Sequence, residues 1–152
     1  MRILDILKEE TIISELHATD KKGVLEELTA PVAQTSGVNQ EEMVRVLMER
    51  ERLGSTGIGD GIAIPHGKLK SLESLLVGFG RSHKGVDFEA IDGKPAHLFF
   101  LLMAPENSTG AHLRMLARIS RLLKDSSFRQ RLMTAADRRK LYMVIADEDN
   151  EF

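Results

Sequence analysis

The sequence contains no cysteine, no tryptophan and only one tyrosine. The absence of cysteine excludes disulfide bonds and thiolate metal sites, and it suits a reducing cytoplasm, where we expect the protein to act. Neither sign of charge dominates, because 21 Lys and Arg residues stand against 23 Asp and Glu residues, and the formal net charge is −2. No basic tract interleaves with aromatic residues, so a nucleic-acid-binding surface is not indicated.

Long apolar runs are also missing. No segment approaches the roughly 18 apolar residues that indicate a membrane helix. The N-terminal residues, MRILD, do not lead into the long apolar core of a secretory signal. We therefore expect no membrane insertion. With 152 residues, of which 42% are hydrophobic, the chain has enough apolar material for a sizeable core. Residues 1–152 are predicted to form a single domain.

Hydrophobic periodicity predicts an α/β fold. The most apolar run, residues 96–103, is bounded by Pro95 and Pro105 and is predicted to be a central strand buried on both faces. Other runs predict strands at residues 11–16, 62–64, 75–80 and 84–89, and helices at residues 22–36, from 39 onward, from about 108 to 123, at 126–135 and at 138–146. We therefore expect a mixed central β-sheet sandwiched between helices.

Proline, glycine and polar residues mark where helices should bend, start and end. Pro31 lies inside the helical pattern of residues 22–36, so a kink or a break is expected there, and Gly37 should end that helix. Asn39 opens the next helix, with Glu42 placed three residues on, as in a capping box. The acidic end, residues 147–152, is expected to be frayed.

Glycine is concentrated in one stretch, residues 54–69, which reads GSTGIGDGIAIPHGKL. This density marks backbone that turns tightly or lets another group come close. The apolar run at residues 62–64 predicts a buried strand, and Pro65 favours extended geometry just before it. Because side chains alternate along a strand, His66 should lie at the end of this strand, on the face of its first and last residues.

These residues alone leave several interpretations of His66 open. It is either a hydrogen-bonded structural histidine or a nucleophile that accepts and returns a group, because neutral imidazole is nucleophilic near pH 7. A third interpretation is a metal hydrolase built on His66 and His112. Against the third, neither an HExxH motif nor clustered carboxylates lies near either histidine.

Helical spacing directs Arg50 inward. It lies seven residues after Met43, near the end of the helix that Asn39 opens, so both residues share the apolar face. An arginine whose stem lies on apolar surface while its head reaches water is equally compatible with this position. Arg52 is the nearby alternative, but it falls off the apolar face.

His112 lies in the first turn of the helix expected from about residue 108, on its apolar face. A lone histidine at such a place is more often a satisfied core residue than a functional one. Three further histidines are weaker candidates for a functional role. His17 and His83 are expected to be exposed, and His97 is expected to begin the central strand.

Residues 57–69, GIGDGIAIPHGKL, resemble the active-site segment of the IIA proteins of the phosphoenolpyruvate-dependent phosphotransferase system. The likeness is to the fructose/mannitol-type IIA superfamily and, within it, to the nitrogen-regulatory branch. Residues 112–123, HLRMLARISRLL, resemble the second histidine helix of the same family. The resemblance extends over nearly the whole chain and is loosest in the N-terminal 20 residues.

The resemblance implies phosphoryl transfer without a metal or another cofactor. A phosphohistidine on a small carrier protein similar to HPr or NPr would donate its phosphoryl group to Nε2 of His66, while a backbone carbonyl holds the proton on Nδ1. His112, near a helix N-terminus, would hydrogen-bond a phosphoryl oxygen, and Arg50 would supply a permanent positive charge. Three glycines would let the donor protein approach: Gly59, Gly61 and Gly67.

The resemblance also implies a role. A sugar-transport IIA protein passes its phosphoryl group to a IIB domain, often in the same chain, whereas this sequence stops at Phe152 without a linker or a membrane segment. We therefore expect a stand-alone regulator, charged by a phosphocarrier and read by target proteins such as transporters or kinases. The alternatives are a sugar IIA protein with a separate IIB partner and a binding module whose phosphorylation only switches that binding.

Overall fold

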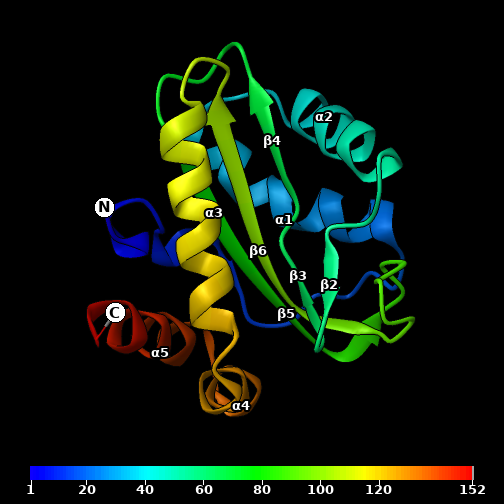
Figure 1. Cartoon of the computed structure of the whole chain (residues 1–152), viewed down its shortest axis with the longest axis vertical. Coiled ribbons are helices and arrows are strands. Elements are labelled where there is room, and N and C mark those ends of the chain that lie inside the picture. The colour runs from blue at the N-terminus through cyan, green and yellow to red at the C-terminus, as the bar shows by residue number, and fades with distance from the viewer. Residues whose placement is uncertain (152) are drawn as a thin grey trace.

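One long strand, β6 (Ala96–Pro105), runs through the middle of the sheet in the computed structural model, which describes residues 1–151 (Figure 1). It pairs antiparallel with β5 (Leu76–Val86) on one side and parallel with β3 (Ile62–Ala63) and β4 (His66–Leu69) on the other. Nearly all of its side chains are buried. The central strand predicted from the apolar run is therefore confirmed.

The sheet is mixed, as predicted. β1 (Ile12–Ile13) pairs parallel with β5 at one edge, and β2 (Gly57–Gly59) pairs antiparallel with β3 at the other. Two short 3-10 turns, η1 (Ile3–Asp5) and η2 (Glu9–Thr11), precede β1. The N-terminal strand is shorter than the predicted residues 11–16, because η2 includes Thr11 and β1 ends at Ile13.

Helices cover both faces of the sheet (Figure 1), which confirms the sandwich. The helices on one face are α1 (Lys21–Ser36) and α2 (Gln40–Arg52), and those on the other are α3 (Thr109–Leu123), α4 (Ser126–Thr134) and α5 (Arg138–Glu151). Across residues 1–151, no helix combines the length and the apolarity that a membrane crossing requires.

Alternating phenylalanines of β6 fill the core on each side of the sheet. Phe99 packs under α1 and α2 and meets Phe88 edge to face, with ring centroids 5.4 Å apart. Phe100 packs under α3 and α5 and meets Phe79 at 4.8 Å. Because each such ring buries about 150–250 Å², these two pairs fix β6 between the helix layers.

The first two helices begin and end as their sequence suggests. Gly37 ends α1 in the left-handed conformation with φ 76°, and the Asn39 side chain accepts a hydrogen bond of 2.9 Å from the Glu42 N–H at the start of α2. Pro31 does not break α1. Leu28, one turn earlier, and Val32, the next residue, are buried against the sheet on either side of the proline.

Two sequence predictions about element boundaries are wrong. Residues 75–80 and 84–89 do not form separate strands, because β5 stays paired with β6 across a register shift between Arg81 and Val86. The expected fraying of residues 147–151 is also wrong, since α5 continues to Glu151. Asp149 is buried there and accepts hydrogen bonds from the Arg118 side chain and the Leu4 N–H. Phe152 lies outside the described residues.

Candidate functional site

His66 is the first residue of β4, not the last residue of the preceding strand as predicted. β3 ends at Ala63, and Pro65, which has no N–H, interrupts the ladder before pairing with β6 resumes at His66 opposite Leu102. The prediction that His66 lies on the same face as Ile64 is confirmed. His66 contacts His112 of α3, and Ile64 is buried under the same helix.

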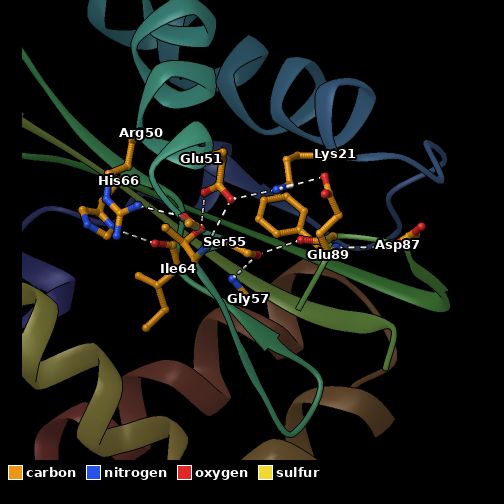
Figure 2. A network of polar contacts seen from close by, with 12 residues as sticks. Lys21, Arg50, Glu51, Ser55, Gly57, Ile64, His66, Asp87 and Glu89 are labelled. Atoms are coloured by element: carbon orange, nitrogen blue, oxygen red, sulfur yellow. Dashed lines mark hydrogen bonds and ion pairs between the residues drawn. The ribbon is translucent and has the colours of Figure 1, made fainter. Parts of the chain in front are cut away.

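A backbone carbonyl sets the tautomer of His66. Nδ1 lies 2.8 Å from the Ile64 carbonyl oxygen (Figure 2). Since a carbonyl oxygen only accepts, Nδ1 carries the proton, and the lone pair is on Nε2. Burial lowers the pKa of His66, and the positive charge of Arg50 lowers it further, while the Ile64 carbonyl and Glu51 act in the opposite direction. The ring is therefore a neutral imidazole near pH 7.

His112 stands against His66 from the first turn of α3. The two ring centroids are 5.5 Å apart and the ring planes meet at 71°. His112 is only 7% exposed, and among residues 1–151 its Nε2 has no hydrogen-bond partner. A buried polar atom without a partner is uncommon in native proteins and costly. Burial lowers the pKa of His112, with smaller contributions from His66 and Lys68.

Arg50 brings a permanent positive charge to the same place. It is half-buried in the last turn of α2, lies beside His66 (Figure 2), and donates a hydrogen bond of 2.9 Å from Nη1 to the Gly54 carbonyl. Arg52 is exposed and lines a groove between α1 and α2 instead. The site thus combines a nucleophilic nitrogen, a fixed cation and a buried imidazole nitrogen that has no partner among residues 1–151, which suits the capture of an anionic group.

Residues 5–148 match the family described as phosphoenolpyruvate-dependent sugar phosphotransferase system, EIIA 2. The chain belongs to this family. It is 43% identical over 146 residues to a nitrogen regulatory protein of Bradyrhizobium diazoefficiens, with 96% of this chain and 95% of that protein covered. It is also 35% identical to the fructose-specific EIIABC component of Bacillus subtilis, over 98% of this chain and 24% of that longer protein.

Solved structures agree with this membership. The crystal structure of the nitrogen regulatory protein IIA-Ntr from Neisseria meningitidis superposes with a TM-score of 0.87 at 34% identity, covering 93% of this chain and 97% of that one. The IIA mannitol structure from Escherichia coli, at 23% identity and a TM-score of 0.77, shares the fold and covers 91% of this chain and 97% of that one. The resemblance drawn from the two histidine segments is confirmed, and with it the general function of a phosphoryl carrier in the phosphotransferase system.

Sequence reasoning missed two charged residues of the site. Lys68 shares the β4 face of His66, two residues on, and donates a hydrogen bond of 2.8 Å to the Thr109 hydroxyl where α3 begins. Glu51 is buried beside Arg50 at the end of α2. The signals were present, because alternation along a strand places Lys68 beside His66, and Glu51 lies four residues after the buried Leu47.

The three glycines expected to admit a donor protein have local structural roles. Gly59 ends β2 with φ 98°, and Gly61 lies in the turn to β3 with φ 76°; this turn lies away from β4 at the lower end of the sheet in Figure 1. Gly67 lies under α2, where a Cβ atom would come within 2.7 Å of Val46 Cγ1. Its role is to let α2 approach β4.

The remaining histidines lie outside the site. His17 is exposed, as predicted. His83 is exposed too, but it belongs to β5 rather than to a polar loop, and its ring bonds to the Glu15 carboxylate and the Met133 carbonyl. His97 binds the Ser82 carbonyl through Nδ1. Within residues 1–151, no group of three or more His, Cys, Asp or Glu side chains is arranged to hold a metal ion.

Proposed function

We propose that Nε2 of His66 accepts a phosphoryl group from a phosphohistidine on a small carrier protein similar to HPr or NPr. The new Nε2–phosphorus bond forms as the nitrogen–phosphorus bond of the donor breaks, in line, and the donor imidazole leaves with the electron pair. The observation that carries this proposal is the 2.8 Å contact between His66 Nδ1 and the Ile64 carbonyl, which leaves Nε2 as the nucleophile.

Arg50 and His112 stabilise the transferred group in this proposal. The Arg50 guanidinium offers a permanent charge and several N–H donors, and it already lies beside His66. Nε2 of His112, buried and unpartnered among residues 1–151, gains a phosphoryl oxygen as its partner. The negative charge on His66 then favours the protonated, donating form of His112. No metal or cofactor takes part in this scheme.

The phosphoryl group acts as a regulatory signal in this proposal. It adds about −1.5 to −2 charges near neutral pH, close to doubling the formal net charge of −2. The added charge lies on the face that partner proteins approach. Target proteins in the cytoplasm, such as transporters or kinases, would therefore bind one form and not the other. The near full-length likeness to nitrogen regulatory proteins supports this role.

A second function is favoured by the likeness to the fructose-specific EIIABC component. In that case the protein is a sugar-type IIA component, and phosphorylated His66 passes its group to a IIB domain. The two functions share the first transfer and differ in the acceptor. Fast transfer to fructose- or mannitol-type IIB domains, together with identical binding partners for both forms, would favour transport over regulation.

The experiment that tests phosphorylation is incubation with phosphoenolpyruvate and the general phosphotransferase proteins, followed by mass analysis. We expect a single phosphoryl adduct that acid releases and base preserves, as for a phosphoramidate. His66→Ala should remain unmodified. His83→Ala is the matched control, because that histidine is exposed and outside the site, and it should be modified like the wild type. A labelled His66→Ala variant would refute the proposal.

A further inference from the structure

Glu51 is a buried carboxylate at the end of α2, with only 6% of its surface exposed. One oxygen accepts a hydrogen bond of 3.1 Å from the Thr56 N–H and lies 3.2 Å from Lys21 Nζ, and the other oxygen accepts a hydrogen bond from the Thr56 hydroxyl. Lys21 is also 3.3 Å from a carboxylate oxygen of Glu89 (Figure 2). The Glu51 carboxylate thus accepts from both donors of Thr56 and shares the positive charge of Lys21 with Glu89.

The clamp on Thr56 extends to the tautomer of His66. The Thr56 carbonyl accepts a hydrogen bond of 3.1 Å from the Ile64 N–H. The Ile64 carbonyl in turn accepts the 2.8 Å bond from His66 Nδ1. Thr56 and Ile64 therefore connect the Glu51 carboxylate to the imidazole through consecutive hydrogen bonds. The Ile64 N–H and carbonyl lie in different peptide planes that join at its Cα, and the following Pro65 restricts Ile64 to extended geometry. Fixing the Ile64 N–H through Thr56 therefore limits where the carbonyl that faces the ring can lie.

The same carboxylate holds the loop on which Arg50 rests. Arg50 donates to the Gly54 carbonyl, and the Gly54 N–H bonds back to the Glu51 carbonyl at 3.1 Å. Two residues on, Thr56 is tied to the Glu51 side chain. The turn after α2 is thus closed on itself by Glu51 from both its backbone and its side chain, with the acceptor of Arg50 in the middle.

We propose that Glu51 is a positioning residue for phosphoryl transfer, which keeps the Ile64 carbonyl aligned on His66 Nδ1 and the Gly54 carbonyl beneath Arg50. It acts through Thr56 and Ile64. A buried charge carries a desolvation cost that a neutral core residue avoids. Glu51 meets that cost with two donors from Thr56 and a cation, and in return fixes the geometry of two site residues. This inference rests on the proposed function of His66.

The decisive measurement is the tautomer of His66 in Glu51→Gln, read from the nitrogen chemical shifts of its ring by NMR. We expect the wild type to carry the proton on Nδ1 and the variant to show exchange between both tautomers. Phosphoryl acceptance from the loaded carrier should slow about tenfold or more in the variant, since small displacements of reacting groups can cost up to about 10²-fold.

Asp149→Asn is the matched control. Asp149 is as deeply buried as Glu51, accepts from one backbone N–H and pairs with one cation, but it does so against α3 and η1 on the other face of the sheet. The Asp149→Asn variant should be less stable but should keep the wild-type tautomer of His66 and the wild-type rate of phosphoryl acceptance. Thr56→Val removes only the hydroxyl donor and should shift the tautomer in the same direction as Glu51→Gln, while Thr56→Ser should restore it.

A folded Glu51→Gln variant with the wild-type tautomer and rate would overturn the inference. If that variant does not fold, Thr56→Val decides in the same way. A different result would refute the proposed function. In that case wild-type protein would carry the proton on Nδ1 of His66 but would accept no phosphoryl group there. The tautomer comparison would still test whether Glu51 positions the ring.

Discussion

Arg50 and Glu51 are neighbours in the sequence, yet the last turn of α2 sends their side chains to different environments. Arg50 is half-buried and donates to Gly54 beside His66, while Glu51 is buried and accepts from Thr56. Consecutive helical residues differ by about 100° around the axis. One helix end can therefore supply both the cation of the site and the anion that fixes the loop under it.

Arg50→Ala should slow phosphoryl acceptance by about 10²–10³-fold, because one preorganised charge-stabilising donor typically contributes that much to a rate. Arg52→Ala is the control, since Arg52 is exposed in the same turn and lines the groove toward α1. Single-turnover transfer from the loaded phosphocarrier measures both. Equal rates in the two variants would mean that Arg50 does not act on the phosphoryl group.

His112→Leu should separate stability from transfer. The buried Nε2 of His112 has no partner in residues 1–151, and an unsatisfied buried polar atom costs about 1–3 kcal/mol. An apolar side chain of similar size should raise the free energy of unfolding by about 1 kcal/mol, measured in urea, while slowing phosphoryl acceptance. His112→Gln, which keeps a hydrogen-bonding group, should recover part of the rate. A fully active His112→Leu variant would contradict the role in transfer, and a less stable one would contradict the cost assigned to the buried Nε2.

Much of the fold could be predicted because the strongest signals are local. The apolar run that forms β6 lies between two prolines, and the helix-ending Gly37 follows directly on α1. The end of α5 could not be predicted, because its acidic residues resemble a solvated tail. Asp149 is buried against partners from distant parts of the chain, the Arg118 side chain, 31 residues earlier, and the Leu4 N–H.

The site divides in the same way. The segments around His66 and His112 carry their own motifs, so both histidines could be predicted as site residues. The 5.5 Å distance between their ring centroids depends on the tertiary structure and could not be predicted. Glu51 lies in a run of charged residues, ERER, which resembles an exposed helix end. Its partners Lys21 and Glu89 come from distant parts of the chain, so periodicity alone does not reveal the clamp.

Gly67→Ala should destabilise the fold by about 1–3 kcal/mol, the usual cost of overpacking. The new Cβ would lie 2.7 Å from Val46 Cγ1 and push α2, with Arg50 at its end, away from β4. Transfer should therefore slow as well, and Val46→Ala in the same chain should restore both properties. Gly80→Ala is the matched control, because its new Cβ would also lie 2.7 Å from a side-chain atom, Cδ2 of Leu28 in α1. It should lower stability in urea without slowing transfer in the folded molecules.

Stability should fall on the acid side because of the two histidines of the site. The pKa of His66 and of His112 is lowered in the folded state, chiefly by burial, whereas an unfolded histidine titrates near about 6.5. Between the lowered values and about pH 6.5 the unfolded chain binds more protons, so the contribution of these groups is complete above that pH and is lost as the pH falls.

Urea unfolding of the wild type and of a His66→Gln, His112→Gln double variant, followed from about pH 7 to about pH 5, checks this expectation around the unfolded pKa of about 6.5. The wild type should lose more stability over this interval, because the variant lacks both titrating groups. Phosphorylation should reduce the loss that His112 contributes, since a negative charge on His66 raises the folded-state pKa of His112 toward or above its unfolded value. Parallel curves for wild type and variant would show that both histidines titrate normally, and that the neutral nucleophile at His66 does not depend on burial.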